Sequence, residues 1–257
     1  MRIWYQSFVD AEHGADYWRH LKAALMAVAD PGTEIDIKGI TPHDSYAHAL
    51  VEFRCAREVI CNAMRAETEG YDAFVIGHFQ DAGLYECRST VDIPVLGLGE
   101  ATLLQACELG QRIGVVSFNR RYDPWFRHQI RKYGLESRVP QIPRMQFEPG
   151  QVTAALESDA VLETISAQFE REMRDAVDSG LDVLVPGGGI PMLAFSRLHA
   201  HSVAGAPVLN GIPIVLKRAE LAVRLKRLTG LQVSRSGEFV RPPAEILKEF
   251  AENPKGL

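Results

Sequence analysis

The stretch Asp72-Ala73-Phe74-Val75-Ile76-Gly77-His78 decides the fold, because a similar stretch, Asp182-Val183-Leu184-Val185-Pro186-Gly187-Gly188, follows it 110 residues later (182 minus 72). The same offset separates Arg2-Ile3-Trp4-Tyr5-Gln6-Ser7-Phe8 from Arg112-Ile113-Gly114-Val115-Val116-Ser117-Phe118. Each half continues with a helix-like segment and a further apolar strand, at 93–97 and at 206–210. Three matching elements at nearly one offset indicate an internal repeat.

Short apolar runs at 74–76 and 183–185 have the length and β-branched content of buried strands. Longer segments between the strands have helical spacing, at 57–65, 103–109 and 161–177. This alternation predicts an α/β protein with two pseudo-symmetric lobes, each a parallel sheet flanked by helices. We expect lobe one to comprise residues 1–100 plus about 206–257, and lobe two about 101–205. The reason is that a basic helix at about 215–229 should return to the first lobe.

Composition excludes several classes of protein. The 257 residues are 46% hydrophobic and 24% charged, as in ordinary soluble enzymes, and the net charge of −5 argues against a nucleic-acid partner. The sequence contains no run of about 18 apolar residues, so we expect no membrane span. The start of the chain lacks the pattern of a signal peptide, so the expected compartment is the cytoplasm. Cys55, Cys61, Cys87 and Cys107 form no CxxC pair, which disfavours zinc and disulfide frameworks.

Because the carboxyl ends of parallel strands meet at one edge of a sheet, the repeated strand ends should converge on a cleft between the lobes. His78 follows a strand and a glycine, where an imidazole could transfer protons or simply bind a neighbouring loop. The turn Gly187-Gly188-Gly189 could form a nest of N–H groups for an anion, or serve only as a tight turn. We take His78 as the catalytic candidate and the three glycines as substrate-binding candidates.

Further candidates lie beside these strand ends. Asp81 could orient His78 or join it in binding a metal, and it is the second catalytic candidate. The hydroxyl groups at strand ends could bind a substrate carboxylate or act as caps. His199 and His201 alternate in a way that suggests a metal site, but no third ligand is near in sequence, so no metal or cofactor is predicted. The remaining substrate-binding candidates are Gln6, Ser7, Phe79, Ser117, Phe118 and Asn119.

The segments 75–84, 93–101 and 182–189 resemble the aspartate/glutamate/hydantoin racemase superfamily, nearest its hydantoin and allantoin racemase branch. The resemblance implies two flavodoxin-like lobes that close over a small carboxylate or cyclic ureide, without a cofactor. It also implies one cysteine from each lobe, on opposite faces of an acidic carbon. Here the two cysteine positions hold His78 and Gly188. Glycine carries no acid or base, so two-base racemisation is not expected.

Three functions stay open. The first is carbon-acid chemistry on a small carboxylate or cyclic amide, as an isomerase, racemase-like enzyme or decarboxylase, with His78 as the single acid/base and an anion nest at Gly187–Gly189. The second is hydrolysis of a small amide or lactone by water activated at His78, with or without a metal. The third is a catalytically silent ligand-binding relative. The resemblance also implies a homo-oligomer.

Overall fold

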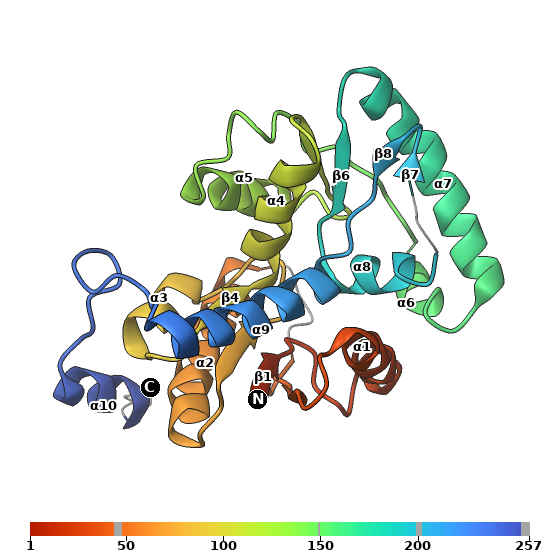
Figure 1. Ribbon diagram of the computed structural model, residues 1–257. Helices are drawn as coiled ribbons and strands as arrows, with labels where there is room; N and C mark the ends of the chain where they lie inside the picture. The colour runs from red at the N-terminus through yellow and green to blue at the C-terminus, as the bar shows by residue number, and fades with distance from the viewer. Residues whose placement is uncertain (44–47, 149, 199–201, 253–257) are drawn as a thin grey trace.

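The computed structural model describes residues 1–43, 48–148, 150–198 and 202–252. The chain forms two α/β lobes, with the red and orange segments in the lower part of Figure 1 and the green and cyan segments in the upper part. The histidines at positions 199 and 201 lie outside the described residues. Among the described residues, no helix is both long and apolar enough to cross a membrane.

The first lobe is built on a parallel sheet in the order β2 (Glu34–Lys38), β1 (Arg2–Gln6), β3 (Ala73–Ile76), β4 (Val95–Gly97). Successive side chains of β1 enter different apolar clusters, Tyr5 with the side chains of α1 (Ala15–Val28) and Trp4 with those of α2 (Ala49–Thr68) and α3 (Leu84–Thr90). Both faces of the sheet are therefore covered, which explains the continuous apolar runs of these strands.

The second lobe repeats this arrangement with fewer regular strand residues. β5 (Ile113–Val116) pairs in parallel with β6 (Val183–Pro186). Residues 141–144 lie beside β5 through two parallel bridges, and Val208 pairs with Leu184 of β6. The order across the sheet is thus the same as in the first lobe. The remaining elements are α5 (Asp123–Lys132), α6 (Gln151–Ala154), α7 (Asp159–Asp178), α8 (Gly189–Phe195), β7 (Ser202–Val203), β8 (Ala206–Pro207) and α10 (Ala244–Glu252).

The repeat is visible at the level of single hydrogen bonds. The backbone N–H of Arg2 donates to Asp72 Oδ2 at 2.8 Å, and the backbone N–H of Arg112 donates to Asp182 Oδ1 at 2.8 Å. In return the N–H of each aspartate donates to the carbonyl of its arginine, at 2.8 and 2.9 Å. The offset of 110 residues in the sequence is therefore a structural equivalence. It ties β3 to β1 and β6 to β5 in the same way.

Two helices exchange lobes. α4 (Leu98–Leu109) follows β4 of the first sheet but packs against β6, whereas α9 (Gly211–Thr229) follows the second sheet but packs against β3 and β4. The two helices also pack against each other, and a Cβ on Gly211 would lie only 2.0 Å from Thr102 Oγ1. One apolar cluster consequently runs through both lobes.

The lobe boundary expected at about residue 206 falls a few residues later in the structure. Val208 pairs with Leu184, so the segment from Ala206 to Leu209 belongs to the second sheet, and the chain crosses to the first lobe only with α9. The strand must complete its ladder before the helix can leave, because an unpaired buried strand would lose its backbone hydrogen bonds. The opposite crossing occurs directly after Gly97, where α4 begins.

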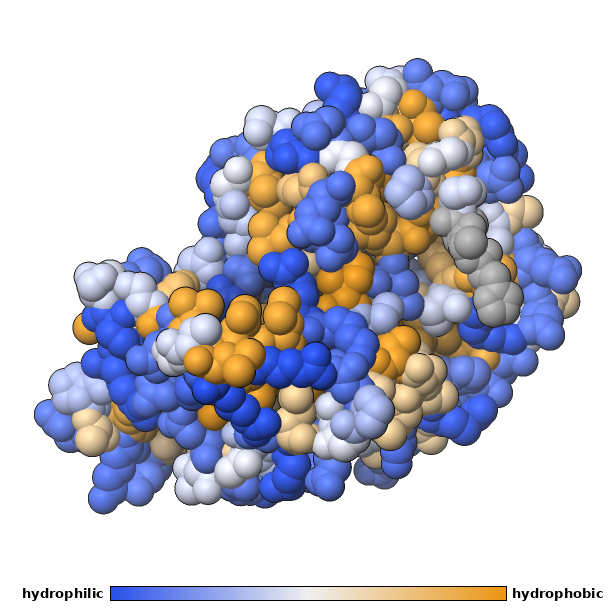
Figure 2. Space-filling view, viewed as in Figure 1, coloured by the Kyte–Doolittle hydropathy of each residue, from blue (hydrophilic) through white to orange (hydrophobic). Residues whose placement is uncertain are grey.

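Apolar side chains also occur on the outward side of α9. Figure 2 shows them in the middle of the view, where Figure 1 places this helix. They include the exposed Leu221 and Leu228. The hydrophobic residues of α9 are therefore not confined to the face that packs on the sheet.

Candidate active site

A cavity of about 180 Å³ lies where the strand ends of the two lobes meet. Its walls come from the loops after β1, β3, β5 and β6 and from α1 and α8. The lining residues are Phe8, Val9, Tyr17, Gly77, His78, Phe79, Gln80, Phe118, Tyr122, Gly187, Gly188, Gly189, Ile190 and Pro191. This size suits a small molecule, and the mostly apolar wall with few polar groups is typical of ligand sites.

Two equivalent glycines bring the backbones together at this point. The N–H of Gly77 donates to Gln6 O at 2.8 Å, and the N–H of Gly187 donates to Val116 O at 2.9 Å. A Cβ on Gly77 would lie 2.2 Å from the Tyr5 ring, and one on Gly187 would lie 2.7 Å from the Phe126 ring. Packing therefore requires glycine at both positions, and the residue that follows each glycine lines the cavity.

The two turns lie against each other across the lobes. A Cβ on Gly189 would be 3.5 Å from the carbonyl oxygen of Gly77 and 3.7 Å from the Tyr17 hydroxyl. The structure thus brings His78 and the three-glycine turn to one cavity.

His78 lies in a confined environment. Its side chain is 16% exposed, its ring stacks on Phe8, and its Nδ1 lies 3.6 Å from Glu52 Oε1. Burial lowers the pKa of His78 to about 3 from the ordinary 6.5, because a protonated imidazole is poorly solvated there. At neutral pH the ring is therefore uncharged.

Glu52 was not among the sequence candidates. It lies in the first turn of α2, one turn before the buried Cys55 and two turns before the buried Val59. A glutamate on the inward face of an amphipathic helix was the available signal. Its partner His78 is 26 positions further on (78 minus 52), so sequence spacing could not link the two.

The prediction that Asp81 orients His78 is wrong. The Asp81 carboxylate accepts hydrogen bonds from the backbone N–H groups of Gly99 and Glu100 at 2.9 and 2.6 Å, from Gln129 Nε2 at 3.0 Å and from the Tyr133 hydroxyl at 2.6 Å. It therefore caps the start of α4. Through Gln129 and Tyr133 it also joins α4 to α5 and to the residue that directly follows α5. Burial raises the pKa of Asp81 to about 7 despite these donors. Its role in the structure is that of a buried link between elements.

The two serines close turns instead of facing the cavity. Ser7 Oγ donates to Val9 O at 2.8 Å and accepts from Val9 N at 3.0 Å. Ser117 Oγ lies 2.6 Å from Asp123 Oδ1 and 3.1 Å from Asn119 O. Neither serine lines the cavity. The two equivalent hydroxyl groups thus satisfy their own loops, as serines after strands often do.

Gln6 and Asn119 are also placed away from the cavity wall. The Gln6 amide donates to three backbone carbonyls and accepts from Trp4 Nε1 and Asn62 Nδ2, so its hydrogen bonds are used within the lobe. Asn119 is exposed and its Oδ1 accepts from the N–H of Arg121. Phe79 and Phe118, by contrast, line the cavity as apolar wall.

Two of the three N–H groups of the expected anion nest are already used in backbone hydrogen bonds. The N–H of Gly187 donates to Val116 O, and the N–H of Gly188 donates to Pro186 O at 2.9 Å. Of the three glycines, Gly189 is left to offer its N–H, at the first position of α8. The absence of side chains still lets a ligand approach the backbone closely.

The four cysteines lie in helices, Cys55 and Cys61 in α2, Cys87 in α3 and Cys107 in α4, and all four are free thiols. None of them lines the cavity. Among the described residues, one group of side chains has the arrangement of metal ligands, namely Asp10, His13 and His43, and it lies outside the cavity lining.

Comparison with known proteins agrees with this architecture. A family profile described as Asp/Glu/Hydantoin racemase matches residues 10–219. The chain belongs to the Asp/Glu/hydantoin racemase family. The predicted resemblance and the predicted α/β fold class are both confirmed.

Individual relatives of this family member are distant. The hydantoin racemase of Pseudomonas sp. (strain NS671) is 29% identical over 171 residues, which cover 66% of this chain and 66% of the relative. The hydantoin racemase of Paenarthrobacter aurescens is 28% identical over 199 residues, covering 77% of this chain and 78% of the relative. The first match thus spans just under two thirds of the relative's length.

A solved structure, the allantoin racemase from Klebsiella pneumoniae, superimposes with a TM-score of 0.77 at 24% identity. The superposition covers 95% of this chain and 94% of the other. It shows that the fold is shared. Within this family, the chain carries His78 and Gly188 in its two equivalent turns.

Proposed function

We propose that this family member is a cofactor-independent enzyme of carbon-acid chemistry, acting on a small cyclic amide or carboxylate with His78 as its single acid/base. The observation that carries the proposal is that the His78 imidazole and the Gly187–Gly189 turn line one small cavity. Hydantoins and allantoin are the compounds named in its relatives, and each contains a carbon made acidic by a neighbouring carbonyl.

The uncharged imidazole takes the proton from the acidic carbon, and the electron pair moves onto the carbonyl oxygen to give an enolate. Glu52, 3.6 Å from Nδ1, stabilises the imidazolium that forms. The N–H of Gly189 is the backbone donor available to the enolate oxygen. His78 then returns a proton to the same face.

The other turn offers no side chain for a second proton transfer, because position 188 is a glycine. The proposed chemistry therefore uses His78 alone. With His78 as the base, it yields exchange of the acidic proton with solvent. With a substrate that carries a second carboxyl group, loss of carbon dioxide would form the same enolate without a base, and the enolate would then take its proton from solvent.

The test is the rate of deuterium incorporation at the acidic carbon in D₂O, followed by proton NMR for hydantoins and allantoin. We expect catalysed exchange in the wild type and a rate roughly 10²- to 10⁴-fold lower in His78→Gln. His20→Gln is the matched control, since His20 binds Glu157 on the surface of α1 and should leave the rate unchanged. Exchange that survives in His78→Gln would exclude His78 as the base.

The variant Glu52→Gln tests whether the Glu52 carboxylate acts on the His78 imidazolium or on the substrate. Removing the negative charge should lower the exchange rate while leaving substrate affinity nearly unchanged, because the carboxylate acts on the imidazolium and not on the substrate. Incorporation of oxygen-18 from water into product would instead indicate hydrolysis. Ligand binding without turnover, unaffected by His78→Gln, would indicate a silent relative.

A further inference from the structure

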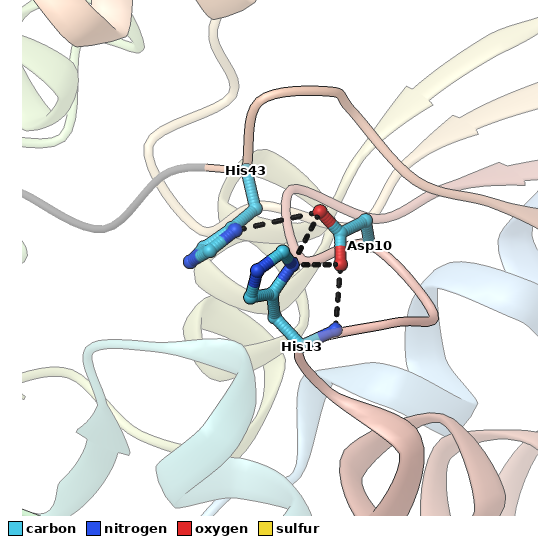
Figure 3. Close-up of side chains that lie close together, drawn as sticks. All are labelled: Asp10, His13 and His43. Carbon is cyan, nitrogen blue, oxygen red and sulfur yellow. Dashed lines mark hydrogen bonds and ion pairs between the residues drawn. The ribbon is translucent and has the colours of Figure 1, made fainter.

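Asp10 and His13, which are three positions apart in the sequence, form a cluster with the more distant His43 beside the cavity. Figure 3 shows Asp10, His13 and His43 with their ligand atoms turned toward one another. His13 Nδ1 lies 2.8 and 3.0 Å from the two carboxylate oxygens of Asp10, and His43 Nδ1 lies 3.4 Å from Asp10 Oδ2. One ligand atom from each residue falls within 4.8 Å of the other two.

The cluster joins the loops that follow β1 and β2. These loops are pressed together, since a Cβ on Gly39 would lie 2.7 Å from Asp10 Cα. The first loop is held by Trp18 Nε1, which donates to Val9 O at 2.9 Å, and by the N–H of His13, which donates to Asp10 Oδ1 at 2.7 Å. The backbone positions of the cluster are thus fixed by bonds that do not involve the imidazole rings.

The second loop is held next to His43. Arg54 Nη1 of α2 donates to the carbonyl of Pro42 at 2.6 Å, one residue before the histidine. The His43 side chain is 25% exposed and that of Asp10 is 12% exposed, whereas His13 is 54% exposed. The cluster is therefore mostly enclosed by protein and open to solvent on the His13 side, which gives an ion a path of entry.

We propose that Asp10, His13 and His43 bind a divalent transition-metal ion such as Zn²⁺ at the rim of the cavity. Two imidazoles and one carboxylate form a ligand set that suits Zn²⁺ and Fe²⁺, and three protein ligands leave at least one coordination position open. Ligand atoms around a tetrahedral Zn²⁺ lie about 3.3 Å apart, given bonds of about 2.0 Å. The 3.4 Å separation between His43 Nδ1 and Asp10 Oδ2 already matches, and His13 Nδ1 lies 3.0 Å from the same oxygen.

The simpler alternative is a hydrogen-bonded cluster without metal. In that case a proton lies between His13 Nδ1 and the Asp10 carboxylate, at the 2.8 Å separation seen here. A metal ion would replace this proton, and binding would release it to solvent. The two possibilities therefore differ in a measurable way. The metal site does not depend on the proposed function of His78.

Its position relates it to the cavity. Val9, which precedes Asp10, lines the cavity, and Phe8 stacks on His78. A metal ion would fix the loop that carries these two residues to the loop after β2. None of the three proposed ligands is among the residues that line the cavity.

The test is titration of metal-free protein with Co²⁺, followed by visible absorption, and competition with Zn²⁺. We expect one ion per chain, and at least tenfold weaker binding in His13→Ala and in His43→Ala. Zn²⁺ should also raise the melting temperature of the wild type by several degrees and that of either variant by much less. Melting curves without metal establish that the variants are folded.

Two controls make the outcome decisive. His20→Ala removes a half-buried histidine from α1, which pairs with Glu157, and should leave Co²⁺ binding unchanged. The double variant His199→Ala/His201→Ala removes the other closely spaced histidines of the sequence and should also bind normally. Equal affinity in the wild type and in His13→Ala and His43→Ala, or loss of binding in either control, would overturn the proposal.

Discussion

The imidazole of His78 lies flat on the ring of Phe8, with 4.0 Å between the ring centroids and an angle of 1° between the planes. One face of the histidine is therefore closed to water by a phenyl ring from the other strand end of the same lobe. An imidazolium in this position would lose hydration on that face. The contact helps to explain why the ring is uncharged at neutral pH.

Phe8→Ala should raise the pKa of His78 from about 3 toward its ordinary 6.5, because water reaches the exposed face of the ring. The measurement is an NMR titration of the His78 Cε1 proton in the wild type and the variant, with His78→Gln used to assign the signal. An unchanged pKa in Phe8→Ala would mean that other groups around the ring exclude water.

The lowered pKa of His78 also predicts how the stability of the folded protein depends on pH. The folded protein binds a proton at His78 only near pH 3, whereas the unfolded chain binds it near pH 6.5. Protonation therefore favours the unfolded chain between these two values. The free energy of unfolding is at its full value above pH 6.5 and decreases as the pH falls toward 3. Between these values the wild type should lose about 1.4 kcal/mol per pH unit more than His78→Gln. Denaturant unfolding of both proteins from pH 7 to pH 4 measures the difference. Parallel curves would show that Glu52 compensates the charge.

Asp81→Asn should lower stability without removing the base. At pH 8, above the pKa of about 7, the carboxylate accepts hydrogen bonds from four donors, and an amide nitrogen would turn two hydrogens toward them. We expect a loss of roughly 1 to 3 kcal/mol in the free energy of unfolding. Deuterium exchange per folded molecule, measured below the melting transition, should stay close to that of the wild type. A specific loss of exchange in a fully folded variant would restore Asp81 as a catalytic candidate.

The neighbouring glycines of the second turn should respond differently to alanine. A Cβ on Gly187 would lie 2.7 Å from Phe126 and 2.8 Å from Val116 O, and we expect Gly187→Ala to cost roughly 1 to 3 kcal/mol through overpacking. Gly188 has extended backbone, with φ 164° and ψ 148°, and the nearest atom to its Cβ would be Pro191 Cδ at 3.1 Å. Gly188→Ala should therefore be tolerated with a smaller loss. Thermal melting of the two variants gives the comparison, and the reverse order would contradict it.

Most of the fold could be predicted from the sequence because the repeat has a physical counterpart. Asp72 and Asp182 recur at one offset since each makes the same bonds to the start of the neighbouring strand. Gly77 and Gly187 recur since each passes beneath an aromatic ring. Such features are local to a strand and its end, so a single sequence records them. The crossing of α4 and α9 is not local, and the sequence accordingly places the lobe boundary only approximately.

The candidate site was predicted less completely, for a related reason. Position after a strand identified His78, but it could not show whether a side chain turns into the cavity or back onto its own loop. Ser7 and Ser117 turn back, and Asp81 turns toward α4. Glu52 is brought to the site by the packing of a helix from another part of the chain. Contacts of this kind follow from tertiary structure and leave no fixed spacing in the sequence.

The exchange of α4 and α9 has a mechanical consequence for the cleft. The lobes are joined by two helices that cross in opposite directions and pack against each other at Gly211, not by a flexible linker. A hinge motion of one lobe relative to the other would have to break the packing of α4 on β6 or of α9 on β3. Opening for entry of a small molecule must therefore proceed by sliding of these packed helices, with small displacements shared by both, or by movement of the rim loops alone.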